Sequence, residues 1–310
     1  AQCLVGSEMC IRDSSLSDQY WIKEENSKIE WNDINFFEND FSEDMGKLLM
    51  GQINYSDDLD IFSPDNSSDG NLKKKWKIIN GIRYLVKGGN SFNNQEPFNE
   101  IIATKLYERI LKNEDYVPYE LIQENGMYYS ACPTMVNTDE ELVSAYYIDR
   151  TIKQRGNDSL YTHFLEACNS LNIPNAKLQI DKMIVCDYII ANYDRHYRNF
   201  GAIRNVNTLE WTGIAPIFDS GSSLWATQPT TRIGTTYKSK PFKPSPDDQL
   251  ELVDNLTWLE TNKLEGFEKE VEEILKSNPL MDEPRIQAII QQINLRIGKV
   301  IERKKQLEKR

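Results

Sequence analysis

The clearest regularities in the chain are two pairs of strand-like runs. The runs 75–79 and 83–87 are rich in β-branched and aromatic residues and flank an Asn-Gly pair at 80–81. An Asn-Gly pair between such runs favours a two-residue β-hairpin, because both turn positions adopt positive φ. A second Asn-Gly pair, at 125–126, divides two further runs in the same way. The pattern therefore predicts two β-hairpins.

A helical pattern lies between these hairpins. Phe98, Ile102, Leu106 and Ile110 recur every four residues, and Pro97 precedes them. Apolar residues at this spacing share one face of a helix, and proline suits a first helical turn. These residues predict an amphipathic helix that packs by one face.

The rest of the chain supports coarser predictions. A short helix is expected to end at Gly51, and the chain from Asp139 onward is mostly helical in pattern, apart from a hairpin expected over 201–211. Near the C-terminus, isoleucines at helical spacing are followed by cations, which predicts a docked final helix. These isoleucines are Ile286, Ile289, Ile290, Ile293, Ile297 and Ile301.

The order of these elements predicts an α+β fold. A β-rich first part, with one helix between two hairpins, precedes a larger helical part. A chain of 310 residues suits one bilobal unit or two domains that share a cleft. Residues 1–16 follow no helical or strand period and carry no basic segment ahead of an apolar one. We therefore treat them as a disordered or artefactual tail.

Composition excludes several classes of protein. The formal net charge of −12 and the pI of about 4.9 disfavour nucleic-acid binding, which depends on Lys and Arg at the phosphates. The five cysteines form no C-x-x-C pair, so neither a disulfide framework nor a zinc site is indicated. No stretch approaches the roughly 20 uninterrupted apolar residues of a membrane span. Composition therefore favours a cytoplasmic protein that binds neither nucleic acid nor membrane directly.

The stretch VCDYIIANYDRHYRNFGAIRN, residues 185–205, contains one of the two histidines of the chain in an Asp-Arg-His sequence. Phosphoryl transfer requires a carboxylate that orients the acceptor hydroxyl, an amide and a second carboxylate that hold Mg2+, and a cation on the nucleotide phosphates. The chain offers these groups, in this order, in Asp194, Asn199, Asp219 and Lys87. The set points to a kinase reaction with ATP and Mg2+.

Two further elements extend this hypothesis. Glu100, on the predicted helix, is expected to pair with Lys87 and hold it in place. The turn at Gly70 and Asn71 is expected to cover the nucleotide phosphates with its backbone N–H groups.

The segments NYDRHYRNFG and PIFDSGSSL resemble the catalytic and metal-binding segments of HipA-like serine/threonine kinases. The resemblance extends from about residue 17 to the C-terminus and is greatest for bacterial proteins of the CtkA type. It implies a two-lobed protein-kinase-like fold that uses ATP and Mg2+. The β-rich N-lobe, with one αC-like helix, would span 17–136, and a larger helical C-lobe would span 137–310.

The resemblance also implies a role for each candidate residue. Asp194 would be the catalytic base, and His196 would brace the catalytic loop or stabilise developing charge. Asn199 and Asp219 would hold Mg2+, and Lys87 would contact the phosphates. A hinge over 134–137 would bring Met135 to the nucleotide.

The chain departs from the family pattern in two respects. Full-length HipA toxins carry a separate subdomain ahead of the kinase core, for which this chain has no room, so an antitoxin-like partner is possible but has no support. The sequence Asp-Ser-Gly at 219–221 replaces the Asp-Phe-Gly of eukaryotic kinases, as expected of this branch.

Three functions stay open. The first is a serine/threonine protein kinase whose substrate the motifs do not identify. The second is a kinase for a small molecule or lipid, although the sequence shows no basic amphipathic anchor for a membrane surface. The third is a pseudokinase that acts as a binding module, which would not need Asp194, Asn199 and Asp219 together.

The loop SPDNSSDGN, residues 63–71, carries Ser63, Ser67 and Ser68 just ahead of the Gly70 turn. From the resemblance, we expect the kinase to phosphorylate one of these serines in its own chain. A phosphate adds roughly −1.5 to −2 charges close to the triphosphate, so it should push the loop out of the cleft. A polar turn whose serines only cap backbone groups is the alternative.

Overall fold

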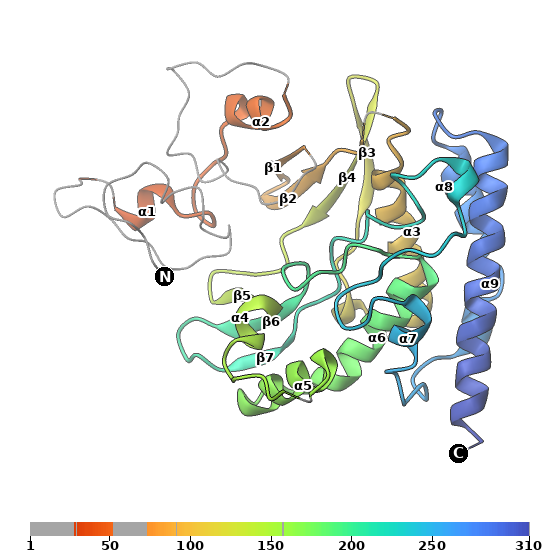
Figure 1. Cartoon of the computed structure of the whole chain (residues 1–310). Coiled ribbons are helices and arrows are strands. Elements are labelled where there is room, and N and C mark those ends of the chain that lie inside the picture. Colours follow the sequence, from red (N-terminus) through yellow and green to blue (C-terminus); the bar gives the residue numbers. More distant parts are fainter. Residues whose placement is uncertain (1–27, 29, 52–72, 91, 157, 310) are drawn as a thin grey trace.

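The computed structural model describes residues 28, 30–51, 73–90, 92–156 and 158–309. Within these ranges the chain forms two antiparallel β-sheets and a set of helices, the mixed α and β architecture that the sequence predicts (Figure 1). The predictions for residues 1–16 and for the loop 63–71, with Gly70 and Asn71, lie outside the described residues.

The four-stranded sheet has the strand order β1-β2-β4-β3, and all of its pairs are antiparallel. Both predicted hairpins are confirmed. Asn80 and Gly81 have φ values of 52° and 79°, and Asn125 and Gly126 have φ values of 50° and 78°, as two-residue hairpin turns require. The strands are β1 (Lys74–Ile79), β2 (Ile82–Lys87), β3 (Glu120–Glu124) and β4 (Met127–Pro133).

The predicted helix between the hairpins is confirmed as α3 (Gln95–Ile110), and its four apolar positions are all buried. Its polar side is buried as well, which the amphipathic pattern did not indicate. Asn99, for example, donates hydrogen bonds of 2.9 and 2.8 Å to the carbonyl oxygens of Gly221 and Ser223. Buried amides are tolerated when they are paired in this way, so α3 can be enclosed on nearly all sides.

The three-stranded sheet has the order β5-β6-β7, from β5 (Glu140–Ser144), β6 (Gly201–Asn205) and β7 (Trp211–Ile214). The predicted hairpin is confirmed in β6 and β7. The prediction of a mostly helical region from Asp139 missed β5, because a strand of this length is defined by its pairing with β6 and not by its own pattern. A Cβ atom at Gly201 would lie 2.2 Å from the carbonyl oxygen of Val143, so only glycine permits this pairing.

The remaining elements are mostly helices, and the longest of them, α9, runs along one side of the molecule (Figure 1). The predicted short helix and the predicted final helix are confirmed as α2 and α9. No helix in the described ranges has both the length and the apolar character that crossing a bilayer would require. The helices are α1 (Trp31–Ile34), α2 (Glu43–Leu49), α4 (Ala145–Asp149), α5 (Leu160–Ser170), α6 (Ala176–Ile189), α7 (Pro246–Leu250), α8 (Phe267–Lys276) and α9 (Glu283–Leu307), with 3-10 turns at Asn113–Asp115, Thr230–Arg232 and Thr261–Leu264.

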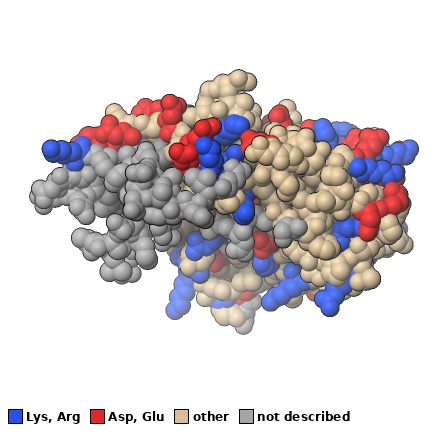
Figure 2. Space-filling view, turned by 90° about the horizontal axis from the view of Figure 1, so that it is seen from above, with Lys and Arg blue, Asp and Glu red and all other residues tan. Residues whose placement is uncertain are grey.

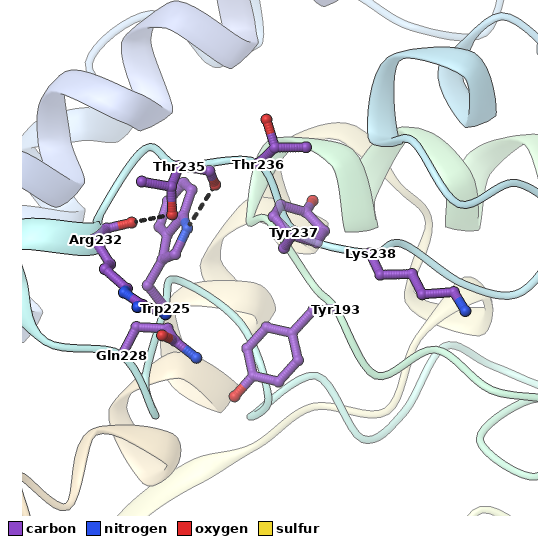
Figure 3. Close-up of a pocket in the computed structure, with 8 residues that line it drawn as sticks. All are labelled: Tyr193, Trp225, Gln228, Arg232, Thr235, Thr236, Tyr237 and Lys238. Atoms are coloured by element: carbon purple, nitrogen blue, oxygen red, sulfur yellow. Dashed lines mark hydrogen bonds between the residues drawn. The ribbon is translucent and has the colours of Figure 1, made fainter.

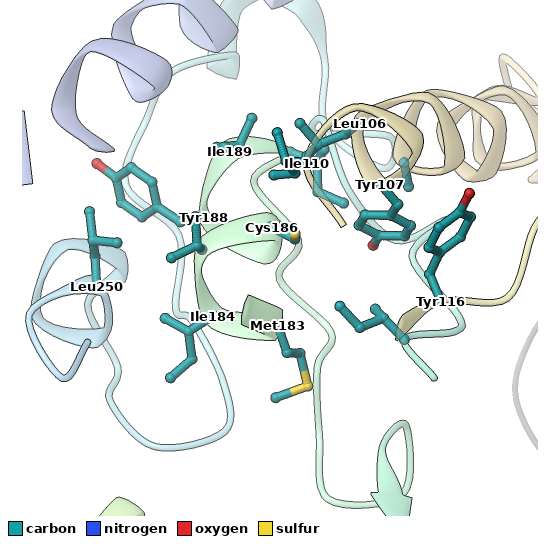
Figure 4. Packing of buried hydrophobic residues seen from close by; sticks show 14 of the residues in the cluster. Leu106, Tyr107, Ile110, Tyr116, Met183, Ile184, Cys186, Tyr188, Ile189 and Leu250 are labelled. Carbon is teal, nitrogen blue, oxygen red and sulfur yellow. The ribbon is translucent and has the colours of Figure 1, made fainter. Parts of the chain in front are cut away.

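The main core extends over most of the helices, and one part of it lies where α3 and α6 meet (Figure 4). Leu106 and Tyr107 from α3 pack there with Cys186 and Ile189 from α6, and all four are buried. Helix α6 leads directly into the Asp-Arg-His sequence. This part of the core therefore fixes the start of the loop that carries Asp194.

Candidate functional site

Lys87, the last residue of β2, lies at the centre of a buried polar cluster. Its Nζ atom is 2.7 Å from Asp219 Oδ1 and 3.3 Å from Glu100 Oε1, and it donates a 3.1 Å hydrogen bond to the Tyr119 hydroxyl. The side chains of Lys87 and Glu100 are 8% and 3% exposed. The predicted pair between Lys87 and Glu100 is confirmed, and the structure adds Asp219 to it.

Glu100 connects this cluster to the backbone after Asp219. Its Oε2 atom accepts a 2.9 Å hydrogen bond from the Ser220 N–H group, while its other carboxylate oxygen faces Lys87. A Cβ atom at Gly221 would lie 3.3 Å from Glu100 Oε1, so glycine leaves room for the carboxylate. One carboxylate of α3 therefore holds both the lysine and the start of the Asp-Ser-Gly segment.

The electrostatics of the cluster keep Lys87 and Asp219 charged. Burial alone would lower the pKa of Lys87, but the attraction of Asp219, Tyr119 and Glu100 raises it well above its usual value. Burial would raise the pKa of Asp219, and Lys87 reverses this and lowers that pKa to about 2. Burial raises the pKa of Glu100 despite the attraction of Lys87. The cluster thus presents a permanent cation beside an ionised carboxylate.

The backbone around Asp219 is strained. Asp219, Leu224 and Trp225 have φ values of 56°, 48° and 54°, which non-glycine residues seldom adopt. The Asp219 N–H group donates a 3.2 Å hydrogen bond to the Tyr119 hydroxyl. Such strain persists where the surroundings hold it, and it is common at functional sites.

Asp194 lies in the loop after α6, on a more open surface. Its Oδ1 atom is 2.8 Å from Lys240 Nζ, and the two side chains are 38% and 43% exposed. The Asp194 carbonyl oxygen accepts hydrogen bonds from the His196 N–H group at 2.8 Å and from the Asn199 side-chain amide at 3.0 Å. His196 Nδ1 in turn accepts a 3.2 Å hydrogen bond from the Arg198 N–H group. The loop is therefore closed by its own side chains.

Arg195 joins this loop to the Asp-Ser-Gly segment. Its guanidinium group is completely buried and makes a two-pronged ion pair with Asp187, with contacts of 2.8 and 3.0 Å. Its Nη1 atom donates to the Asn199 carbonyl oxygen at 2.7 Å and also to the Phe218 carbonyl oxygen. Its Nη2 atom donates to the Ser220 hydroxyl at 3.1 Å. A single side chain thus brings the backbones beside Asn199 and Asp219 together.

The pair Asn199 and Asp219 has the donors that Mg2+ prefers, which are hard oxygen atoms. The side-chain nitrogen of Asn199 donates a hydrogen bond to the Asp194 carbonyl oxygen. Within the described ranges the side-chain oxygen of Asn199 accepts no hydrogen bond. The Asp219 side chain remains 37% exposed beside Lys87. Among the described residues no group of three or more His, Cys, Asp or Glu forms a complete metal cage. This donor set suits an ion that keeps water and phosphate ligands, as Mg2+ does.

Met135 lies on the connection between the two sheets. It packs against a small cluster that contains Val117 and Cys132 and also against one that contains Ile203. The Thr134 N–H group donates a 2.8 Å hydrogen bond to the Arg83 carbonyl oxygen at the edge of β2. Met135 thus occupies a linker between the sheets, and its contact with a nucleotide stays a prediction.

Sequence reasoning missed three residues of this site. Tyr119 has no motif of its own, and only the fold brings its hydroxyl to Lys87. Lys240 is 46 residues from Asp194, so no local spacing links the two. Arg195 did carry a signal, because its partner Asp187 interrupts an otherwise apolar run on α6 and a charge in such a run calls for a buried partner.

A pocket of about 290 Å³ opens beside Tyr193, the neighbour of Asp194 (Figure 3). Its wall includes the rings of Trp225 and Tyr237, and it carries the cations Arg232 and Lys238. The lining residues are Tyr193, Trp225, Gln228, Arg232, Thr235, Thr236, Tyr237 and Lys238.

Comparison with known proteins links the chain to a kinase. Over 101 residues it is 32% identical to the serine/threonine-protein kinase CtkA of Helicobacter pylori, a match that covers 31% of this chain and 31% of that protein. The crystal structure of a Helicobacter pylori proinflammatory kinase CtkA is similar with a TM-score of 0.58 at 21% identity, over 76% of this chain and 94% of that chain. No family model matches the chain. The chain therefore shares its fold with this kinase structure, while the sequence match spans about a third of the curated relative.

Proposed function

We propose that this chain is a serine/threonine protein kinase with a two-lobed kinase fold, ATP as donor and Mg2+ as cofactor. The observation that carries the proposal is the buried Lys87–Glu100–Asp219 cluster, which Arg195 links to the loop of Asp194 and Asn199. The similarity to CtkA in fold, and in part of the sequence, supports the same reading. Kinship with HipA-like kinases and the lobe boundaries at 17–136 and 137–310 are parts of this proposal.

Lys87, Glu100, Asp219 and Asn199 form the nucleotide side of the proposed site. Lys87 would move its ammonium group onto the ATP phosphates, and Glu100 would keep the lysine in position. Asp219 and Asn199 would hold Mg2+, which would neutralise the charge that develops on the phosphates. The raised pKa of Lys87 ensures that this residue stays a cation for that role.

Asp194 and Lys240 form the acceptor side. As the substrate hydroxyl oxygen bonds to the γ-phosphorus, the bond from that phosphorus to the bridging oxygen breaks, ADP leaves and Asp194 takes the hydroxyl proton. The hydrogen bonds that close the loop hold the backbone of Asp194 in place, and Lys240 contacts its carboxylate. His196 supports this loop through the Arg198 N–H group.

A kinase for a small molecule or lipid and a pseudokinase are the alternatives. Among the described residues of the face in Figure 2, Lys and Arg are interspersed with Asp and Glu and do not gather into one continuous basic area of the kind that binds anionic lipid surfaces. The retention of Asp194, Asn199 and Asp219 together favours catalysis over a binding module.

Incubation with labelled ATP, Mg2+ and a cell lysate separates these functions, with Asp194→Asn as the matched inactive control. We expect label on serine or threonine of a protein in the wild-type sample above the level in the control. Label in a small molecule or lipid would identify the second function, and no label above the control would identify the third.

We also propose that the kinase phosphorylates Ser63, Ser67 or Ser68 in its own 63–71 loop. Peptide mapping by mass spectrometry after incubation with ATP and Mg2+ tests this, again against Asp194→Asn. Absence of phosphate from all three serines in a preparation that labels other proteins would rule it out. A cytoplasmic location and the identity of the protein substrate or of any antitoxin-like partner stay predictions.

A further inference from the structure

The segment 220–246, which follows Asp219, differs in charge from the rest of the chain. It contains four cations, Arg232, Lys238, Lys240 and Lys243, and neither Asp nor Glu. The whole chain carries 48 acidic residues among 310 and a net charge of −12, so a stretch of this length without an acid stands out. We call it the cationic segment.

The cationic segment builds the pocket of about 290 Å³ beside the proposed base. The ring of Tyr237 packs edge-on against the rings of Trp225 and Tyr193, with centroid distances of 6.2 and 6.5 Å. The Trp225 indole N–H group donates a 3.3 Å hydrogen bond to the Thr235 carbonyl oxygen, which closes one wall (Figure 3). The pocket is therefore held by contacts within the segment and by the contact of Tyr237 with Tyr193.

Helix α9 supports these walls from behind. The Arg296 guanidinium group lies 5.4 and 5.2 Å from the ring centroids of Trp225 and Tyr237. Gly234 has a φ of 85°, and a Cβ atom there would lie 2.7 Å from the Gln292 side chain, so glycine lets the segment run close to α9. The aromatic walls are thus fixed on a long helix, as a preformed binding site requires.

The cations of the pocket are exposed. Arg232 and Lys238 lie at opposite ends of the pocket, with the aromatic rings between them (Figure 3). Within the described ranges neither side chain makes an ion pair with a carboxylate. In an acidic chain, two exposed cations that flank an aromatic pocket favour a ligand with a negative charge.

We propose that this pocket binds an acidic side chain of the substrate protein that lies close in sequence to the phosphorylated serine or threonine. The inference rests on the proposed kinase function and extends it to substrate selection. Tyr193 of the pocket adjoins Asp194, and Lys238 lies two residues before Lys240, the partner of Asp194. A substrate chain whose hydroxyl reaches Asp194 therefore has its neighbouring residues at the pocket.

The first test measures binding without catalysis. The probe is a fluorescently labelled peptide with a central serine flanked by glutamates. Fluorescence anisotropy compares its affinity with that of the same peptide carrying glutamines in place of the glutamates. We expect the glutamate peptide to bind about tenfold more tightly to the wild type, because hydrogen bonds to charged partners are the stronger ones. Arg232→Glu/Lys238→Glu should abolish that preference. Lys305→Glu/Lys309→Glu, which reverses two exposed cations at and just beyond the C-terminal end of α9, is the matched control and should keep it.

The second test measures transfer from ATP to the same two peptides. The inference is supported if the wild type has a lower KM for the glutamate peptide than for the glutamine peptide. Arg232→Glu/Lys238→Glu should lose this difference in KM and still label the glutamine peptide. Equal binding and equal KM for the two peptides would overturn it while leaving the kinase proposal intact. Preferential binding of the glutamate peptide without any phosphoryl transfer would instead contradict the proposed kinase function. It would still support the pocket as a binding site for acidic ligands.

Discussion

The two sides of the proposed site differ in how deeply the fold encloses them. On the nucleotide side, the side chains of Lys87 and Glu100 are 8% and 3% exposed and belong to a network that includes α3 and the Asp-Ser-Gly segment. On the acceptor side, Asp194 and Lys240 are 38% and 43% exposed and form an isolated pair. Lys87 and Glu100 are therefore part of the core, while Asp219, which is 37% exposed, and the acceptor pair lie on a surface that ligands can reach.

The largest expected effect concerns Arg195, which joins the two sides. Arg195→Met removes the buried cation that pairs with Asp187 and the donor to two backbone carbonyl groups, so we expect a loss of about 3–5 kcal/mol in the free energy of unfolding. Denaturant unfolding measures this loss. Arg195→Lys keeps the charge and should restore only part of the stability, because lysine lacks the planar guanidinium group that donates several hydrogen bonds at once. A loss below about 1 kcal/mol would contradict the role of Arg195 as the link.

The next effect distinguishes the two proposed metal ligands, Asp219 and Asn199. Asp219→Ala and Asn199→Ala should both weaken Mg2+-dependent ATP binding, and Asp219→Ala should weaken it more, because a charged oxygen contributes more to a hard cation than an amide. Titration of ATP affinity against Mg2+ concentration tests this order. Unchanged metal dependence in Asp219→Ala would remove this residue from the proposed metal site.

A smaller effect is the pH dependence of the cluster. The folded protein holds the pKa of Asp219 at about 2, below its ordinary value of 3.8, so the carboxylate stabilises the fold above about pH 4 and loses this contribution as the pH falls toward 2. Solvent screening at a side chain that is 37% exposed limits the contribution to about 1 kcal/mol. The stability difference between wild type and Asp219→Asn should shrink over this range. A difference that stays constant with pH would show that Asp219 is not held ionised by Lys87.

The smallest effect is expected at the exposed pair. Lys240→Met should change the free energy of unfolding by less than about 1 kcal/mol, because ion pairs between partly exposed side chains contribute little. The measurement is the same denaturant unfolding used for Arg195. A loss as large as that of Arg195→Met would show that the acceptor side is as firmly built into the fold as the nucleotide side.

The parts of the fold that could be predicted are those whose conformation is determined by residues close together in the sequence. Asn-Gly pairs require positive φ wherever they occur, so the hairpins at 80–81 and 125–126 could be predicted without tertiary information. The spacing of apolar residues likewise predicted α3 and α9. Strand β5 could not be predicted, because its five residues acquire their conformation by pairing with β6 far along the chain.

The same distinction applies to the site. Lys87 and Glu100 could be paired from the sequence because a strand end and the following helix are close in any compact arrangement. The Tyr119 hydroxyl and Lys240 reach the site only through the three-dimensional fold. The acceptor side was therefore the less predictable one, and its pocket could be recognised only after the cationic segment was seen folded.

The central claim is that Asp194 acts on the acceptor while the Lys87 cluster acts on the nucleotide. One experiment tests it most directly: ATP affinity in the presence of Mg2+ and the rate of transfer are measured together for wild type, Asp194→Asn and Lys87→Met. We predict that Asp194→Asn loses at least about 100-fold in transfer and keeps its ATP affinity, whereas Lys87→Met loses both. Transfer near the wild-type rate in Asp194→Asn, or unchanged ATP affinity in Lys87→Met, would contradict the account.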